Sequence, residues 1–522
     1  MILHGNDLRV QILDAMSQIE NTVCQTLGVN GRTVIVKKFY QNNGEIIGTE
    51  NVSTKDGFTI TEYLARETQG LLQAIADMLH KSIGRQWTDV GDGTTTATKM
   101  CITFYKLMVK EIEDSPQINV HQLVNKYKGY AEKIIEGLTK QKRNVETPEE
   151  LIRIATISAN NDETIGKIVG DVVWKASKYG KVSVEKSLGH GITSEIVDGY
   201  VIGGCQQPYW LQVHGVHAFK AQKPKIILTT DLISAGKDVM NLMATYDSFK
   251  DPSITFVIIC HSITLECAKH IAKNNEERVK NRLPPYRFVF IEHGKTEGTE
   301  KREFMEDLAA ISSAKLLSKE LNGRAFGALN RSDLGEVNLV DCNMQETALE
   351  FTKTDVMNTH IETIQKEFDD IKTLGQRKEW LNTRLCYFKG AIGKIFVGAI
   401  TSGERSQNDD FIDDSVKTAR SALKDGYLLG GGLALLNIQT DGTAAMRSIC
   451  DAPFLQMCEN SGIAPNNLLG VVDNRIGIDY FSGGLINYEE KGIFDSFRSQ
   501  TTAVQVGCSF ACNLITANTK IG

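Results

Sequence analysis

The sequence predicts a multidomain α+β protein whose two ends are mostly helical and whose middle mixes short strands with helices. Two observations support this prediction. Apolar residues recur at helical spacing through most of residues 7–140, and β-branched or apolar segments of strand length recur between residues 182 and 291. A chain of 522 residues also exceeds what one hydrophobic core usually serves, so roughly two to four domains are expected.

The N-terminal part of the chain is expected to form helices joined by turns. Residues 7–27 carry apolar side chains at helical spacing, and this helix should stop at the turn Gly28-Val29-Asn30-Gly31. Residues 33–36 are β-branched and predict a strand. Long amphipathic helices are predicted at residues 62–84, 97–114 and 120–140.

The character of the chain changes after residue 143. Thr147-Pro148 predicts a helix start, because proline suits the first helical turn, and residues 160–163 predict a second cap. The strands predicted downstream are residues 182–184, 193–197, 226–230, 255–260, 288–291 and 395–397. Helices are predicted at residues 355–387, at 411–423 and in a last stretch that ends at Ile515.

Residues 90–98, Val-Gly-Asp-Gly-Thr-Thr-Thr-Ala-Thr, carry the most informative local pattern. A glycine loop that runs into a helix start can hold a phosphate, because the first-turn N–H groups have no partner inside the helix. Asp92 adds a hard oxygen ligand suited to Mg²⁺, and the threonine hydroxyls can bond phosphate oxygens. The alternative is an ordinary capped helix with a turn before it. The apolar face expected for this helix is Ala97, Met100, Cys101, Phe104, Leu107, Met108 and Ile112.

A second glycine cluster, Gly430-Gly431-Gly432, lies inside an apolar run near the other end of the chain. It indicates that another backbone or a ligand comes very close, with close helix packing as the alternative. Candidate nucleotide features therefore lie near both ends of the chain.

Composition narrows the function classes. A net charge of −6 gives no basic footprint, so nucleic acid is not expected as a partner. No apolar run has the length of a membrane span, and the N-terminus lacks the pattern of a signal peptide. We therefore expect a cytoplasmic protein with no membrane partner.

The eleven cysteines show no C-x-x-C pair and are expected to be reduced, small buried side chains. His214 and His217 have no convincing third ligand nearby, so no metal site is predicted there. The sequence patterns of serine hydrolases, zinc proteases and P-loop nucleotidases are absent.

Six phrases in a fixed order give the chain a resemblance to the group I chaperonins, the bacterial GroEL type, over nearly its full length. The phrases are Thr26-Leu27-Gly28…Gly31-Arg32, Thr54-Lys55-Asp56-Gly57, Gly91 to Thr98, Thr156-Ile157-Ser158-Ala159-Asn160…Asp162-Glu163-Thr164, Gly430-Gly431-Gly432…Ala434-Leu435 and Gly492-Ile493…Asp495. Six phrases together are far more specific than any one of them.

The resemblance implies an ATP-driven protein-folding machine with the α+β chaperonin fold. Residues 1–140 and 425–522 would form one discontinuous, mostly helical equatorial domain. Residues 141–197 and 361–424 would form a small intermediate domain that acts as a hinge, and residues 198–360 an α/β apical domain that binds non-native polypeptides.

The resemblance also implies roles for individual residues. Asp56 and Asp414 would orient and activate the attacking water, and Asp92 would hold Mg²⁺. Asp414 lies in the intermediate part, so hydrolysis should require that part to close onto the pocket. The implied cofactors are ATP and Mg²⁺, with K⁺ as a further candidate. The other residues implied to line the nucleotide pocket are Thr26, Leu27, Gly28, Lys55, Gly57, Gly93, Thr94, Thr95, Thr96, Ile157, Gly431, Ile493 and Asp495.

The apical positions that match the family's client groove are expected to form an exposed apolar strip, which would bind unfolded chains without sequence preference. These positions are Tyr209, Trp210, Met240, Met243, Cys267, Ile271 and Ala272. Ordinary core packing is the alternative for each of them. The groove departs from the family where Cys205 and Gln206 stand in place of an aromatic residue and a leucine, which leaves docking of a co-chaperonin cap open.

Other departures concern assembly. Val29 replaces the family's proline, the hairpin of residues 37–53 is longer than usual, and Thr359 stands at the hinge glycine. A single or double ring, most simply of seven subunits, is expected, in a divergent chaperonin that a phage could encode. Two function classes stay open: an active ATPase chaperonin, and a non-catalytic ring that serves as a protein-binding scaffold.

Overall fold

The computed structural model describes residues 3–42, 45–159, 161–187, 191–203, 218–234, 236–292, 298–343, 346–371, 375–398, 402–464 and 474–520. The chain forms two compact units. The helical unit comprises Met1–Trp174, Val184–Ser194 and Ile395–Gly522, and the sheet unit comprises Lys175–Ser183 and Glu195–Lys394. The segments expected as equatorial lie in the helical unit, and the expected apical segment, residues 198–360, lies in the sheet unit. The segments expected as a separate intermediate domain are divided between the two units.

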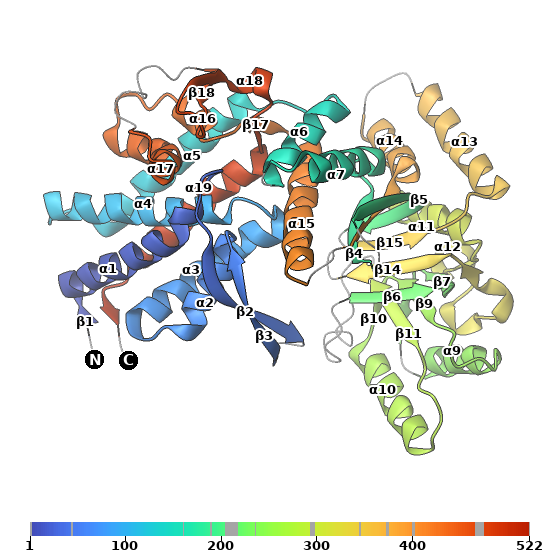
Figure 1. The fold of residues 1–522 in the computed structure, drawn as a ribbon. Coiled ribbons are helices and arrows are strands. Elements are labelled where there is room, and N and C mark those ends of the chain that lie inside the picture. Colours follow the sequence, from blue (N-terminus) through green and yellow to red (C-terminus); the bar gives the residue numbers. More distant parts are fainter. Residues whose placement is uncertain are drawn as a thin grey trace. The chain divides into compact units, whose positions relative to one another are not determined.

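Five long helices form the core of the helical unit, with α4 and α19 packed against each other at its centre (Figure 1). The predicted apolar face of α4 is confirmed: six of its seven side chains are buried, and Leu107 is partly buried. The short strands β1 (Leu3–His4) and β21 (Thr519–Lys520) pair antiparallel and bring the two ends of the chain together. The five helices are α1 (Gly5–Val23), α3 (Gly70–Asp89), α4 (Thr94–Asp114), α5 (Val120–Gln141) and α19 (Phe497–Ile515).

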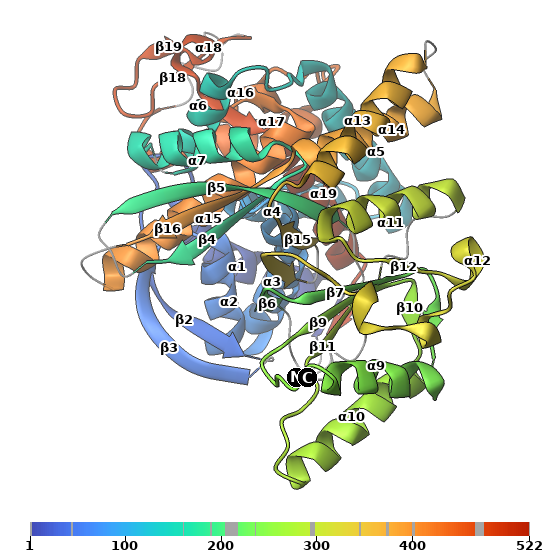
Figure 2. The same ribbon diagram turned by 90° about the vertical axis from the view of Figure 1, so that its right-hand side faces the viewer.

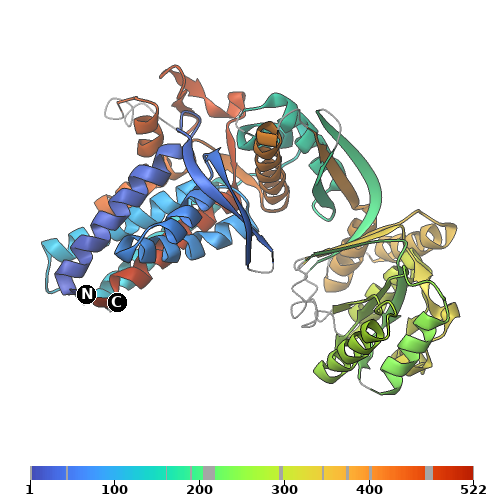
Figure 3. The same cartoon turned by 60° about the horizontal axis from the view of Figure 1, so that its bottom comes forward.

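A hairpin, the long helix α15 and several shorter elements complete the helical unit. The hairpin of β2 (Val34–Asn42) and β3 (Glu45–Thr54) extends from the helices and leads directly to Lys55 and Asp56 (Figure 3). The remaining elements are η1 (Cys24–Thr26), α2 (Gly57–Glu67), α6 (Pro148–Ser158), α15 (Ser402–Asp425), β17 (Tyr427–Leu429), α16 (Leu433–Leu436), α17 (Ala444–Asn460), β18 (Ile476–Ile478), β19 (Leu485–Asn487), α18 (Tyr488–Lys491) and β20 (Phe494–Ser496).

The sheet unit is built around a parallel sheet with the strand order β11-β9-β7-β12, and the short β13 pairs antiparallel with β7. Side chains alternate between its two faces. Helices α9 and α10 cover one face of this sheet, and α11, α13 and α14 lie on the side of the other face (Figure 2). Ile227, Ile258 and Phe290 pack against the first pair of helices, and Ile226, Val257 and Val289 pack toward the second group. The strands are β7 (Lys225–Thr229), β9 (Phe256–Cys260), β11 (Phe288–Glu292), β12 (Leu316–Leu317) and β13 (Gly335–Glu336), with β8 (Leu232–Ile233) and β10 (Ser262–Ile263) paired beside them.

A second, six-stranded sheet has the order β4-β16-β5-β15-β14-β6. Its strands are β4 (Lys181–Lys186), β16 (Ala391–Val397), β5 (Ile192–Gly203), β15 (Glu346–Glu350), β14 (Leu339–Asn343) and β6 (Ala218–Gln222). The helices with residues in the sheet unit are α7 (Glu163–Ala176), which begins in the helical unit, α9 (Lys237–Asp247), α10 (Leu265–Lys280), α11 (Gly298–Ser312), α12 (Lys319–Asn322), α13 (Asp355–Asp370) and α14 (Gln376–Lys389), with the short turns η2 (Phe326–Ala328) and η3 (Arg331–Asp333).

Three predicted helices are wrong in their extent. The helix predicted at 411–423 begins earlier, at Ser402, as α15. The stretch 62–84 was predicted as one helix but is divided between α2 and α3 at Gly70, whose positive φ of 72° does not fit a right-handed helix. The long helix predicted at 355–387 is two helices, and extended backbone at Gly375 precedes the second one. The strands predicted at 226–230, 255–260 and 288–291 are confirmed as β7, β9 and β11.

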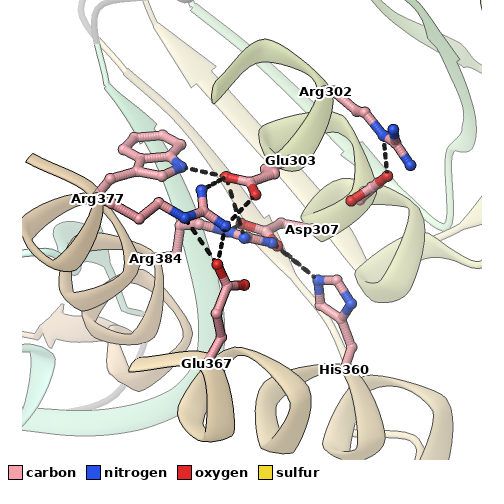
Figure 4. Close-up of polar contacts among 9 residues, drawn as sticks. Arg302, Glu303, Asp307, His360, Glu367, Arg377 and Arg384 are labelled. Carbon is pink, nitrogen blue, oxygen red and sulfur yellow. Dashed lines mark hydrogen bonds and ion pairs between the residues drawn. The ribbon is translucent and has the colours of Figure 1, made fainter. Parts of the chain in front are cut away.

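A buried ion-pair cluster joins α11 to α13 and α14 (Figure 4). Asp307 is fully buried and accepts hydrogen bonds from Arg384 Nε at 3.0 Å and Nη2 at 2.5 Å. His360 Nε2 lies 2.7 Å from the same carboxylate. Glu303 accepts two bonds from Arg377, at 2.7 and 2.6 Å. These charges are paired and hydrogen-bonded, as buried charges must be.

Candidate functional site

Four carboxylates from distant parts of the sequence converge in the helical unit: Asp56, Asp92, Asp414 and Asp495. Burial raises the pKa of Asp414 well above its usual range, and the negative charges of Asp56 and Asp92 raise it further. Burial and the charge of Asp92 also raise the pKa of Asp495, to about 7. These mutual effects show that the four groups share one electrostatic environment.

Asp56 is held at the start of α2. Its carboxylate caps the helix by accepting bonds from the backbone N–H groups of Phe58 and Thr59, both at 3.0 Å. Thr94 of α4 donates a further bond from its hydroxyl to Asp56 Oδ1, at 3.2 Å. The capping bonds orient Asp56, and the bond from Thr94 joins it to the start of α4.

The loop that carries Asp92 is shaped by two glycines. Gly91 and Gly93 have φ values of 81° and 80°, in the left-handed region that favours glycine. Gly93 N–H donates to Asp92 Oδ1 at 2.6 Å, and the side-chain amide of Gln86 donates to the Asp92 carbonyl, also at 2.6 Å. Burial raises the pKa of Asp92, the Gly93 N–H lowers it, and Asp56 raises it again.

The start of α4 has the features of an anion site. Gly93 is its N-cap residue and supplies no side chain to cap the first-turn N–H groups, so these donors are available to a ligand. Thr94 and Thr95 are buried, and the Thr95 hydroxyl lies 3.3 Å from that of Thr26. A Cβ at Gly57 would lie only 2.8 Å from Thr95 Oγ1, so the start of α2 lies in close contact with the start of α4. The sequence-based interpretation of an ordinary capped helix does not explain this open start.

Asp414 is brought to the site by α15, which packs against α6. Ser415 donates to the carbonyl of Ala155 at 2.7 Å, and Ser158 donates to the hydroxyl of Thr418 at 3.0 Å. Ile157 lies half-buried on α6, next to Ser158. In this structure the helix that carries Asp414 therefore already belongs to the same compact unit as Asp56 and Asp92.

Asp495 lies on β20 beside the second glycine cluster. Gln500 donates to Asp495 Oδ2 at 2.7 Å, and a Cβ at Gly430 would lie 3.0 Å from Asp495 Oδ1. Gly430 N–H bonds to the carbonyl of Ile493 at 2.9 Å and so fixes β17 against β20. The close backbone approach inferred from the glycines is therefore present at Gly430.

The other predicted pocket residues lie around these groups. Leu27 packs with Tyr480 and Met457, Gly28 has a φ of 83°, and the Gly431 carbonyl accepts a bond from the Tyr480 hydroxyl at 2.9 Å. Lys55 Nζ donates to the carbonyl of Val29 at 3.4 Å, and burial lowers the pKa of Lys55. Thr96 is half-buried on the first turn of α4.

The donor set suits Mg²⁺ bound together with phosphates. Within the described ranges, no three His, Cys, Asp or Glu side chains are grouped as an all-protein metal site. Mg²⁺ is usually held by one or two carboxylates plus substrate phosphates and water, so Asp92 beside an open helix start fits that role. Carboxylates whose pKa values burial and mutual repulsion raise are groups that a cation would stabilise in the charged form.

Four supporting residues carried no signal in the sequence. Gln86 and Ser499 bind the Asp92 carbonyl, Gln500 binds Asp495, and Tyr480 binds the Gly431 carbonyl. Apart from Gln500, which lies five residues from Asp495, each is more than five residues from its partner in the sequence, and amides and hydroxyls are common on any helix. Only the tertiary fold identifies them.

The predicted client strip is only partly exposed. Met240 on α9 is 66% exposed and Ala272 on α10 is half-buried, but Met243, Cys267 and Ile271 lie in the core between these helices and the sheet. The expected exposure is wrong for these three side chains, because their helix faces cover Phe256, Ile258 and Phe290. Tyr209, Trp210, Cys205, Gln206, His214 and His217 lie outside the described residues.

None of the helices in the described ranges combines the length and the apolar character that crossing a membrane requires.

Comparisons with known proteins agree with the fold. The model of the TCP-1/cpn60 chaperonin family matches residues 19–521. Two crystal structures of the chaperonin gp146 from the bacteriophage EL 2 (Pseudomonas aeruginosa), both in presence of ATP-BeFx, resemble the chain with TM-scores of 0.73 and 0.64. In both cases the sequences are 18% identical, and the match covers 100% of this chain and 99% of the other. The chain therefore belongs to the TCP-1/cpn60 chaperonin family.

Proposed function

We propose that this chaperonin hydrolyses ATP at the four-carboxylate site and uses the reaction to drive cycles of client binding and release. The observation that carries the proposal is that Asp56 and Asp92 are both hydrogen-bonded at the open start of α4, while α15, the helix that carries Asp414, packs against Gly91 beside them. Phosphoryl transfer needs charge neutralisation and an aligned nucleophile more than covalent help, and this set of groups can supply both.

Each group of residues in the site has its own proposed role in binding or hydrolysis. The first-turn N–H groups of α4, with the hydroxyls of Thr94, Thr95 and Thr96, would hold the phosphates. Asp92 would hold Mg²⁺, which when bound neutralises charge on the phosphate oxygens. Asp56 and Asp414 would accept hydrogen bonds from the attacking water and orient it toward the terminal phosphate.

The rest of the nucleotide would lie toward the second glycine cluster. The loop 26–28 and Gly431 are joined there by the packing of Leu27 against Tyr480 and by the Tyr480 bond to the Gly431 carbonyl. Lys55, Gly57, Gly93, Ile157, Ile493 and Asp495 complete the proposed pocket.

Asp414→Asn tests the catalytic assignment. We expect phosphate release to fall by about 10²-fold or more, because removal of a general base typically has an effect of that size, while a fluorescent ATP analogue still binds. Asp441→Asn is the matched control, since Asp441 is a carboxylate on the exposed surface of the same unit. Hydrolysis at the parent rate by Asp414→Asn would contradict the assignment, and no hydrolysis by the parent chain would favour the non-catalytic scaffold.

For the clients we propose the apolar side chains that are exposed where α9 and α10 begin. Leu232 is 52%, Met240 66% and Leu265 52% exposed. The strands β8 and β10, which pair with each other, lead into these two helices, so the three side chains lie on adjacent segments. An exposed apolar surface of this kind can bind non-native polypeptides without sequence preference.

We further propose that the chain assembles into a ring in the cytoplasm of a bacterial host cell. The likeness to a bacteriophage chaperonin supports a phage origin. Ring size and the need for a co-chaperonin are decided by imaging the purified protein with and without ATP.

A further inference from the structure

One side chain of α15, Lys417, contacts two other segments of the site, at Gly91 and at Trp87. Its aliphatic stem lies against the backbone of Gly91, where an added Cβ would stand 2.1 Å from Lys417 Cδ. Its ammonium lies 4.4 Å from the centroid of the Trp87 ring, a cation–π distance. The first contact adjoins Asp92, and the second reaches α3.

Trp87 is itself part of a stack that ends at Asp56. The rings of Trp87 and Phe58 are stacked at 4.8 Å with an interplanar angle of 9°, and Phe58 stacks in turn on His80 at 4.2 Å. The backbone N–H of Phe58 caps Asp56. A continuous set of contacts therefore runs from Lys417 through two aromatic rings to the helix start that orients Asp56.

Lys417 also lies on the same helical face as Asp414, three residues earlier in α15. Asp413, four residues before Lys417, holds the ammonium at 2.6 Å. The lysine is thus fixed within its own helix and simultaneously packed on two other segments of the site.

We propose that Lys417 is a positioning residue: it latches α15 onto Trp87 and Gly91 and so holds Asp414 opposite Asp56 and Asp92. This inference rests on the proposed function, since it assigns Lys417 a role in the hydrolysis that Asp414 supports. The latch depends on the missing side chain at position 91, because a Cβ there would displace the lysine stem. It also makes Trp87 a built-in reporter of whether α15 is docked.

The test is Lys417→Met, which keeps the length of the stem and removes the charge. We expect kcat for ATP hydrolysis to fall about tenfold while KM and the binding of a fluorescent ATP analogue stay within about twofold of the parent, because the phosphate cradle is untouched. Lys417→Arg should recover most of kcat, since an arginine can also lie over the indole. Lys424→Met is the matched control on the same helix, because Lys424 is exposed.

The second readout is independent of hydrolysis. The Trp87 contribution to the fluorescence, obtained by subtracting the spectrum of Trp87→Phe, should shift to longer wavelength and be quenched about twofold more by acrylamide in Lys417→Met, and stay unchanged in Lys424→Met. Parent-like kcat and parent-like Trp87 emission in Lys417→Met would overturn the latch. If the parent shows no ATPase activity, the proposed function fails, and the Trp87 emission still decides whether the latch exists.

Discussion

At the scale of single residues, burial and neighbouring carboxylates disfavour the charged forms of the acidic side chains in the site. Asp495 illustrates this, because burial and the nearby Asp92 raise its pKa to about 7 from the ordinary 3.8. A carboxyl whose pKa is higher in the folded than in the unfolded state binds more protons when folded. Its contribution to stability is therefore present at low pH and is lost as the pH rises from about 4 to about 7.

Asp495→Asn should remove this pH dependence. The amide keeps an oxygen that can accept the bond from Gln500 but carries no charge to bury. Without nucleotide, the variant should be more stable than the parent above pH 7, by on the order of a few kcal/mol, and the difference should shrink toward pH 4. Urea unfolding at several pH values measures it, and a difference that does not vary with pH would contradict the prediction. The exposed Asp441→Asn serves as the control.

The residues of the site were predictable from the sequence to very different degrees. Asp92 stands between two glycines in a short phrase whose local chemistry already indicates phosphate and metal binding, whereas the role of Asp56 was implied only by the family resemblance. Gln86, Ser499 and Lys417 act through contacts with backbone or rings that the fold brings from elsewhere in the chain. No local pattern distinguishes such an amide, hydroxyl or ammonium from one on a solvated helix face.

At the scale of elements, α13 and α14 depend on the buried ion-pair cluster shown in Figure 4. Arg384 is 3% exposed and pairs with the fully buried Asp307. Replacing it by Met leaves Asp307 with His360 as its remaining partner within the cluster, and breaking a buried pair in this way usually costs about 3–5 kcal/mol. We expect Arg384→Met to lower the free energy of unfolding by that amount.

The control for this prediction lies on the exposed side of α11, the helix that carries Asp307. Arg302 pairs with Glu306 at 2.7 Å, but its side chain is 61% exposed, and solvent screens exposed pairs so that they contribute little to stability. Arg302→Met should therefore change stability little. Thermal and denaturant unfolding of the two variants compare the pairs directly, and equal losses would show that the buried cluster has no special role.

Element boundaries were the least predictable part of the fold. The amphipathic pattern continues across Gly70 and across residues 371–375, so periodicity alone joins α2 to α3 and α13 to α14. The breaks come from backbone conformations, a positive φ at Gly70 and an extended Gly375, that a hydrophobic pattern does not report. The buried strands β7, β9 and β11 were easier to predict, because continuous apolar runs of strand length leave few alternatives.

At the scale of the whole molecule, one chain supplies two compact units of different construction. The helical unit contains all four carboxylates of the site, which come from its N-terminal and C-terminal segments. The sheet unit carries the exposed apolar side chains at the starts of α9 and α10. The sequence predicted this division through the contrast between long amphipathic helices and short strands. It did not predict which apolar side chains of α9 and α10 face solvent, because both faces of these helices carry them.

The client surface gives the prediction that involves the whole molecule. Met240→Ser combined with Leu265→Ser should weaken the capture of a chemically unfolded protein severalfold, because both side chains are more than half exposed and offer apolar area to a partner. Hydrolysis of ATP without client should be unchanged, since neither residue belongs to the helical unit. Val356→Ser is the matched control, an apolar side chain of the sheet unit that is 66% exposed on α13. If Val356→Ser weakens capture as much as the double variant, clients bind through general surface hydrophobicity, and the surface at the starts of α9 and α10 has no special role.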